Sequence, residues 1–334
     1  MRIRWLPSAT FILVVVLIMN LGCSQRSTMC PGIGCGTVAS PSPSPPATLP
    51  PTRVYVGNVS GGIDAFNLPI SATSTPAAAI STLGSSPGGG VMNFDATGRL
   101  YVAQGSVGVY SQPIRTGSNP AFRFKTPNGC SSPPMIPPCS AYEVSLDSAG
   151  DAFVLEDGSC HPFPCLAVGE FKAPLTNASA ESVHFPVLGY DDNIALDGAG
   201  NLWLSSSNGL GPSGICEFGP SFNATPAFCF SIGGPIYLRG MAFDSTGNLY
   251  AASDTGVWVM NPPFSGATTP AFRIDSGDNN RSVAFDSNGN LYTISNYGKN
   301  LNVYSPPFSA SSTPSVTFSL SALGINGGPI AIGP

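Results

Sequence analysis

A string close to Phe-Asp-Ser-x-Gly-Asn-Leu-Tyr recurs along this chain, and it constrains the fold more than any other feature. Its aspartates are separated by 52, 50, 47 and 42 residues: Asp95, Asp147, Asp197, Asp244 and Asp286. Asp favours the first position of a type I turn, and Gly supplies the positive φ that completes it. Because a short apolar run precedes and follows each turn, each copy predicts a β-hairpin.

Each hairpin is followed by two further strand signals. A third apolar run ends at a proline and a bulky residue, and proline suits a strand end because it has no N–H for the ladder. These prolines are Pro69, Pro113, Pro174, Pro263 and Pro307. A second proline then opens a fourth run, as Pro76 and Pro270 do. Units of four strands that repeat every 40 to 50 residues predict the blades of a β-propeller.

The two ends of the repeat region are complementary. Arg53–Val56 matches the second strand of the unit, and Pro329–Ile332 matches the first strand alone. We therefore predict an all-β, six-bladed propeller of four-stranded antiparallel blades, with the first blade closed by the C-terminal strand. Closure removes exposed strand edges. The alternative is an open solenoid of the same units.

The repeated strings resemble NHL-type β-propeller repeats, and the resemblance covers residues 52–334. It implies a fold that hosts both enzymes and binding scaffolds, so it does not choose a function. Propeller lyases of similar fold use histidine on one face, and gluconolactonase-like propellers use a Glu, Asn and Asp metal set with an early Glu-Gly-Pro. Here His161 and His184 occupy unrelated repeat positions, where we expect surface residues, and no Glu precedes Glu143.

The N-terminal residues have the pattern of an export signal. Arg2 and Arg4 precede the apolar run Phe11–Met19, which is too short to span a bilayer. Asn20-Leu21-Gly22-Cys23 then resembles a bacterial lipoprotein box, which implies cleavage before Cys23 and its acylation; ordinary secretion is the alternative. We predict a signal peptide over residues 1–22, a Pro/Ser-rich tether over 23–51 and the propeller over 52–334. The expected address is the bacterial cell envelope, as a membrane-anchored lipoprotein or in the periplasmic or extracellular space.

The other eight cysteines form close pairs in the sequence, which in an exported chain favours disulfides. Cys216 and Cys229 fall in neighbouring predicted strands, and the spacing lacks the Cys-x-x-Cys of a metal cluster. The predicted pairs are Cys30/Cys35, Cys130/Cys139, Cys160/Cys165 and Cys216/Cys229.

Charge and composition limit the classes of binding partner that we expect. Charged residues are 9% of the chain and the formal net charge is −5, which gives no electrostatic case for nucleic acid. We expect a monomer.

Ser86 matches a Gly-x-Ser-x-Gly string, but no helix follows, so we interpret it as part of an interblade loop. We identify no catalytic residue.

The residues that break the repeat lie in loops on one face of the predicted ring. Acids, amides and aromatics are dense there: Tyr190, Asp191, Asp192, Arg239, Asp275, Asp278, Asn279 and Asn280. Such loops suit a sugar, a peptide or Ca²⁺, although ordinary polar turns have the same composition. The expected function is a non-catalytic binding or scaffold module for a protein or glycan. The alternative is a metal-assisted hydrolase or lyase acting on a sugar or lactone.

Overall fold

The computed structural model describes residues 52–334 except 60, 82–90, 126–134, 161–163, 188–190, 207–212, 221, 223–224, 235 and 276. For 135–139, 157–160, 164–165, 186–187, 191–192 and 206 it describes the backbone alone. Ser86, His161, Tyr190, the tether cysteines and Cys130 therefore lie outside the described residues. Within the described part, no helix is long and apolar enough to cross a membrane.

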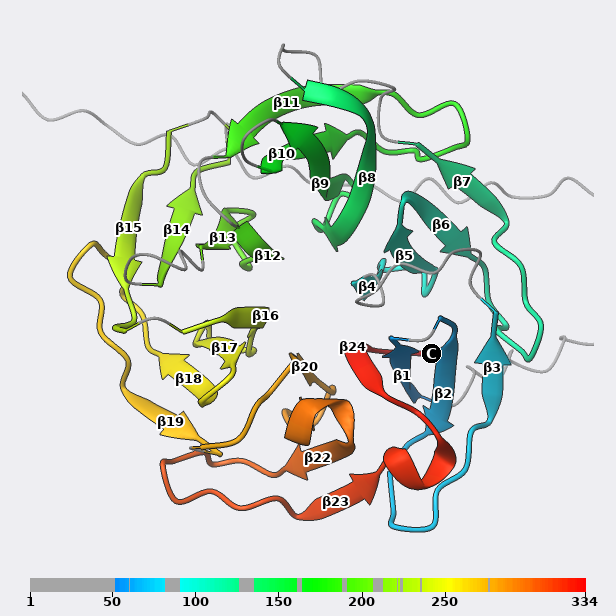
Figure 1. Ribbon diagram of the computed structural model, residues 1–334, viewed down its shortest axis with the longest axis vertical. Helices are drawn as coiled ribbons and strands as arrows, with labels where there is room; N and C mark the ends of the chain where they lie inside the picture. Colours follow the sequence, from blue (N-terminus) through cyan, green and yellow to red (C-terminus); the bar gives the residue numbers. More distant parts are fainter. Residues whose placement is uncertain are drawn as a thin grey trace, which may run out of the picture. The chain divides into compact units, whose positions relative to one another are not determined.

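Six four-stranded antiparallel sheets follow one another around a ring (Figure 1), which confirms the predicted propeller. From the innermost strand outward, blades 1 to 3 consist of β24 (Gly327–Gly333), β1 (Arg53–Asn58), β2 (Ile63–Asn67) and β3 (Ala78–Ile80); β4 (Met92–Phe94), β5 (Leu100–Gln104), β6 (Ser106–Tyr110) and β7 (Phe122–Phe124); and β8 (Met135–Leu146), β9 (Ala152–Cys160), β10 (Pro164–Phe171) and β11 (Glu181–Val187).

Blades 4 to 6 consist of β12 (Asp191–Leu196), β13 (Leu202–Ser206), β14 (Gly214–Phe218) and β15 (Phe228–Ser231); β16 (Leu238–Phe243), β17 (Leu249–Ser253), β18 (Gly256–Met260) and β19 (Phe272–Ile274); and β20 (Ser282–Phe285), β21 (Leu291–Ser295), β22 (Asn300–Tyr304) and β23 (Val316–Ser319). Two short 3₁₀ turns, η1 (Asn296–Gly298) and η2 (Ser321–Leu323), lie in the loops.

The C-terminal strand closes the first blade as predicted. β24 pairs antiparallel with β1, with Val54 opposite Ile332 and Val56 opposite Ile330. The Tyr55 hydroxyl also donates a hydrogen bond of 2.7 Å to the Pro334 carbonyl. The red C-terminal strand thus lies beside the blue first strand in Figure 1, and it covers the edge of β1 that would otherwise be unpaired.

The repeated aspartate organises the hairpin turn at the start of each unit. In blade 5, Asp244 Oδ1 accepts the backbone N–H groups of Thr246 and Asn248, both at 2.9 Å. Asp244 Oδ2 accepts the Asn248 amide at 2.9 Å and the Tyr250 hydroxyl at 3.3 Å. The turn glycine Gly247 has a φ of 85°, which only glycine adopts without strain. The recurring carboxylates are therefore fold determinants, as the sequence predicts.

Replacing Asp244 with alanine is expected to lower the free energy of unfolding by about 3 kcal/mol, because several charge-assisted hydrogen bonds are lost together. Burial alone would raise the pKa of Asp244, but the hydrogen bonds from Asn248 and Thr246 outweigh it and lower the pKa. A depressed folded-state pKa stabilises the fold fully above the unfolded pKa of about 4, and this contribution is lost as the pH falls through the folded-state pKa.

The measurement is urea unfolding of wild type and Asp244→Ala at pH 7 and pH 3. The difference between the two proteins should shrink at pH 3, and the exposed neighbour Ser245 supplies a control, Ser245→Ala, that should match wild type. An Asp244→Ala protein as stable as wild type at pH 7 would show that the turn does not depend on this carboxylate.

The blades adhere through apolar clusters between neighbouring sheets. One aromatic residue near the end of the third strand of each of these blades is buried in these clusters, as Phe66, Tyr110, Phe171 and Tyr304 show. The residue after each strand-ending proline also packs there: Ile70 joins the cluster between blades 6 and 1, and Ile114 the cluster between blades 1 and 2. These aromatics are interblade core.

One predicted disulfide falls within the described residues and is confirmed. Cys216 of β14 and Cys229 of β15 face each other in the ladder, and their sulfurs are bonded. For Cys139, Cys160 and Cys165 the backbone alone is described, and Cys30, Cys35 and Cys130 lie outside the described residues, so their pairings stay predictions.

Candidate functional site

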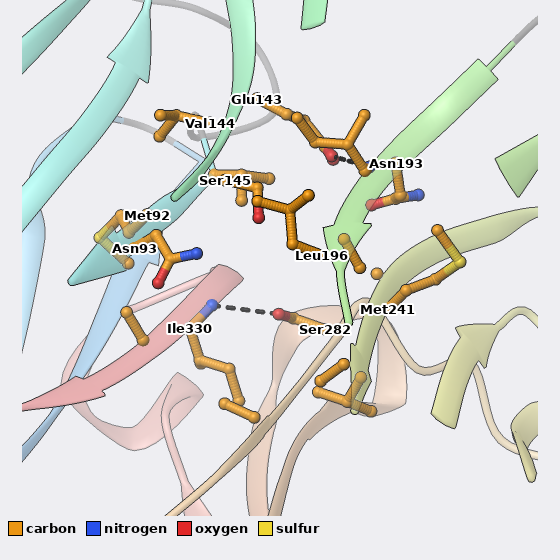
Figure 2. Close-up of a pocket in the computed structure, with 18 of the residues that line it drawn as sticks. Met92, Asn93, Glu143, Val144, Ser145, Asn193, Leu196, Met241, Ser282 and Ile330 are labelled. Atoms are coloured by element: carbon orange, nitrogen blue, oxygen red, sulfur yellow. Dashed lines mark hydrogen bonds between the residues drawn. The ribbon is translucent and has the colours of Figure 1, made fainter. Parts of the chain in front are cut away.

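The six innermost strands surround a central cavity of about 270 Å³. Figure 2 shows that its lining comes from all of these strands, for example Met92 of β4, Glu143 of β8, Asn193 of β12, Met241 of β16 and Ile330 of β24. This volume is slightly below the roughly 300 to 1,000 Å³ of typical small-ligand pockets. The cavity therefore suits a small group or the end of a longer ligand.

The polar side chains deep in this cavity connect neighbouring blades. Glu143, Asn193 and Ser282 each lie four residues before a turn aspartate. Glu143 Oε2 accepts the Ile194 N–H at 2.6 Å, Asn193 Nδ2 donates to the Leu238 carbonyl at 3.1 Å, and Ser282 Oγ accepts the Ile330 N–H at 3.1 Å. Figure 2 shows the bond between Ser282 and Ile330. All three bonds join one inner strand to the next blade, so these groups are engaged in the scaffold.

Two arginines lie one residue earlier in the repeat, at the end of the inner strands where the chain enters from the loops. Arg239 is exposed, lines the cavity and has no ion-pair partner among the described residues. Arg281 is half-buried, and its guanidinium donates to Asn326 Oδ1 and the Gly327 carbonyl, both at 3.2 Å. Burial and the nearby charge of Arg239 lower the pKa of Arg281. Neither guanidinium forms an ion pair among the described residues, and the Glu143 carboxylate lines the same cavity as Arg239.

Exposed tyrosines accompany the arginines on this face. Tyr142 of β8 lies at the same repeat step as Arg239, Tyr237 precedes β16, and Tyr297 lies in η1; they are 45%, 53% and 61% exposed. Tyr297 has a φ of 57°. Its neighbour Gly298 is so close to Arg281 that a Cβ there would lie 2.9 Å from the guanidinium. We call Tyr142, Tyr237, Arg239, Arg281 and Tyr297 the channel mouth.

The loop residues that the sequence singles out fall into two separate groups in the structure. Arg239 belongs to the channel mouth. Asp275, Asp278, Asn279 and Asn280 belong to one loop between blades 5 and 6, whose side chains form hydrogen bonds within the loop and to Asn296. Asp278 Oδ1 accepts the N–H groups of Asn279 and Asn296, and Asn280 Nδ2 lies 3.4 Å from Asp275 Oδ2. Burial and the Asp278 charge raise the pKa of Asp275. For Asp191 and Asp192 the backbone in β12 alone is described, and Tyr190 lies outside the described residues.

A role of this loop in holding Ca²⁺ stays a prediction. The side-chain oxygens of Asn279 and Asn280 are buried without a hydrogen-bond partner in the described structure. Such oxygens and two carboxylates match the ligand types that Ca²⁺ prefers. Whether any of the predicted loop residues binds a ligand likewise stays a prediction.

Sequence reasoning missed Tyr142, although its position is readable from the repeat. Tyr142, Arg239 and Arg281 all lie five residues before a turn aspartate, so aligning that step around the ring would have grouped them. His184, which we expected at the surface, lies on the outermost strand of blade 3. Its side chain is 22% exposed and hydrogen-bonded to Glu181.

The comparisons with known proteins show the fold. No protein-family model matches the chain, and no curated protein sequence matches it. A protein of unknown function from Bacteroides caccae is 12% identical, with a TM-score of 0.61 over 85% of this chain and 99% of that one. The periplasmic gluconolactonase of Pseudomonas aeruginosa is 13% identical, with a TM-score of 0.56 over 85% and 99%. A Lactobacillus plantarum protein is 12% identical, with a TM-score of 0.54 over 84% and 98%. At these identities the likeness establishes a six-bladed β-propeller fold.

Proposed function

We propose that this chain is an exported, lipid-anchored binding module of the bacterial cell envelope that holds an anionic glycan at the channel mouth. The observation that carries the proposal is the exposed Arg239 guanidinium, which lines the central cavity without an ion-pair partner among the described residues. The address rests on the export signal and on the lipoprotein-like box at Cys23. The proposal also assigns the repeats to the NHL type, on the basis of the recurring Phe-Asp-Ser-x-Gly-Asn-Leu-Tyr string.

The chemistry of the channel mouth favours a carboxylated sugar. A guanidinium presents a planar fork of N–H donors that matches a carboxylate. The exposed tyrosines provide flat apolar faces with a polar tip, which suit the mixed surface of a sugar ring. The net charge of −5 does not oppose this, because charges farther than about 8 Å are largely screened at physiological salt. The exposed Arg239 guanidinium at the entrance therefore favours an anionic ligand, whereas Glu143, deeper in the cavity, accepts a backbone N–H of the next blade.

The size of the cavity favours the end of a glycan chain as the ligand over the broad surface of a folded protein. The cavity that Arg239 lines has a volume of about 270 Å³, which accommodates a sugar residue and not a folded partner. A protein that presents an acidic extended segment would use the same groups, and the test below distinguishes these two partners by supplying the glycan alone.

The test is calorimetric titration of the oxidised protein with oligogalacturonate and with neutral malto-oligosaccharide. Wild type should bind the acidic oligomer selectively, and Arg239→Gln should weaken binding about 10- to 100-fold, because a charge-assisted hydrogen bond contributes about 1.5 to 3 kcal/mol. The matched control is Arg115→Gln, which changes an exposed arginine in a loop on the opposite face. Equal binding by wild type and Arg239→Gln, or no binding of the acidic oligomer, would overturn the proposal.

The alternative is a metal-assisted hydrolase or lyase that acts on a sugar or lactone at the same face. The fold shared with a gluconolactonase supports it only as a fold that is able to carry such chemistry. The same titration separates the two functions. Product formation from the oligomer or from a lactone would favour the enzyme, whereas binding without turnover favours the module.

A further inference from the structure

Two carboxylates and one imidazole converge in blade 3, away from the channel mouth. Single ligand atoms of Glu156 in β9 and of Glu181 and His184 in β11 all lie within 4.8 Å of one another. His184 Nδ1 is 2.7 Å from Glu181 Oε1. The set therefore offers one nitrogen and two oxygens to a common point.

The ladder explains why these side chains meet. Glu156 lies opposite Ala167 of β10, and His184 lies opposite Gly169 of the same strand. Because residues two apart on a strand share a face, β10 presents only these small residues between the two flanking strands. A Cβ on Gly169 would lie 2.5 Å from Glu181 Oε1 and 2.9 Å from Glu156 Oε1. The missing side chain at Gly169 is thus what lets the ligand atoms converge.

The buried carboxylate lacks a partner that would account for its position. Glu156 is 1% exposed, and its Oε1 has no hydrogen-bond partner in the described structure. Burial, and then the nearby charge of Glu181, raise the pKa of Glu156 to about 8, while His184 opposes the shift. An uncompensated buried carboxylate is costly, and such groups are normally paired or bound to a metal.

In blades 4, 5 and 6 the same position is occupied by side chains that contact a neighbouring side chain, whereas blade 2 also has a glycine there, Gly108. The register aligns Gly169 and His184 with Cys216 and Cys229 in blade 4, which form the disulfide. In blade 5 the pair is Trp258 and Arg273, with the guanidinium 4.8 Å from the ring centroid.

Blade 6 has a neutral polar version of this arrangement. Asn302 of β22 occupies the aligned position and donates a hydrogen bond of 2.9 Å to Ser295 Oγ, the residue aligned with Glu156. Blade 3 departs from all three by placing two acids and a histidine around an empty glycine position. Because residues that maintain the fold recur in every blade, residues that differ in one blade are candidates for a function beyond the fold.

We propose that Glu156, Glu181 and His184 form a divalent transition-metal site, with Zn²⁺ as the ion. Imidazole suits Zn²⁺, and carboxylate oxygens bind it at about 2.0 to 2.2 Å. Donors around a tetrahedral ion at these lengths are about 3.3 Å apart. Binding therefore requires the most widely spaced ligand atoms, which lie within 4.8 Å of each other, to move closer by up to about 1.5 Å, and the ion would replace the 2.7 Å hydrogen bond between His184 and Glu181. A fourth position remains for water.

The ion would link β9 to β11 across β10, as the disulfide links β14 to β15 in the next blade. It would also neutralise the buried Glu156 carboxylate. Because the ligands come from two strands that meet only in the folded blade, Zn²⁺ binds the native state in preference to the unfolded chain and raises its stability.

The first experiment measures melting and metal binding of the full oxidised chain, stripped with EDTA, at pH 8.5 where protons compete least. Zn²⁺ at about a hundredfold excess over Kd should raise Tm by about 5 °C. Co²⁺ should give visible d–d bands without a thiolate charge-transfer band, which assigns the ion to nitrogen and oxygen ligands and excludes the cysteines.

Two variants test the geometry separately. Glu156→Gln keeps the shape but removes a ligand, and should weaken Zn²⁺ binding on the order of 100-fold. Gly169→Ala leaves every ligand in place but fills the space between them, and should abolish the Zn²⁺-induced shift. The control is Gly108→Ala at the aligned position of blade 2, where the nearest atom to the new Cβ would be 3.5 Å away.

Zn²⁺ shifts that persist in Gly169→Ala and Glu156→Gln, or no shift and no cobalt spectrum in wild type, would overturn the site. If Gly169→Ala fails to fold, the wild-type cobalt spectrum and Glu156→Gln still decide. Arg239→Gln should leave Zn²⁺ binding unchanged, so this result and the glycan result are independent.

Discussion

Deleting Gly327–Pro334 is expected to abolish the native ring, with a loss of at least about 5 kcal/mol, which is comparable to the whole net stability of a typical domain. The deletion removes β24, uncovers the edge of β1 and exposes side chains that are now fully buried, Val54, Tyr55 and Val56. It also opens the two clusters that Ile330 and Ala331 complete. An unpaired apolar edge promotes aggregation.

The measurement is soluble yield and the circular-dichroism melt of the truncated chain beside a control that lacks residues 40–47 of the predicted tether. The control should fold like wild type. Adding the peptide Gly327–Pro334 to the truncated chain should recover part of the folded signal, because the missing strand pairs through its own backbone. A cooperative melt of the truncated chain near the wild-type Tm would show that closure does not hold the ring together.

Replacing Trp203 with alanine is expected to cost about 3 to 5 kcal/mol, as large-to-small core substitutions do. Trp203 is fully buried in the cluster between blades 4 and 5. Its ring lies 5.0 Å from Phe264 and 5.5 Å from Phe243, and its indole N–H donates to Asp197 Oδ2 at 3.1 Å. The substitution removes aromatic packing across the blade interface and one bond to the turn aspartate.

Two further substitutions make the Trp203 result specific when all are compared by urea unfolding. Trp203→Tyr should retain much of the stability, because Tyr250 and Tyr292 occupy the same repeat position and donate to their own turn aspartates. Trp258→Ala removes a partly buried tryptophan and should cost clearly less. Equal losses for Trp203→Ala and Trp258→Ala would contradict the importance of this interface.

The hairpins and the blade count were predictable because their signals are local and repeated. The conformation of each Asp-x-x-Gly turn depends on hydrogen bonds within five residues, such as those that the backbone N–H groups of Thr246 and Asn248 donate to Asp244. Repetition then makes each copy support the interpretation of the others. The closing strand followed from the same logic, because Pro329–Ile332 matches one fragment of the unit and Arg53–Val56 begins at the next.

The pairing of Cys216 with Cys229 was also predictable, since both residues fall at matching steps of adjacent strands. The channel mouth was predictable only in part. The sequence singled out Arg239 and the loop residues because they break the repeat. It did not show that Arg239 lies exposed at the channel mouth while Asp275 and Asp278 form hydrogen bonds within their own loop and to Asn296, because this depends on which side chains lie close together in the fold. Composition does not report such contacts.

From the sequence alone came the ring of six blades, the role of the turn aspartates and the closing strand, because these depend on short-range turns and strict periodicity. Only the tertiary structure brought Glu156 together with Glu181 and His184, and only it placed Arg239 beside Arg281. Glu156 and His184 are separated by a whole strand, and Gly169 between them is one of 39 glycines, so nothing local marks it. Cross-strand register and burial decide such sites, and both arise only when distant segments pack against each other.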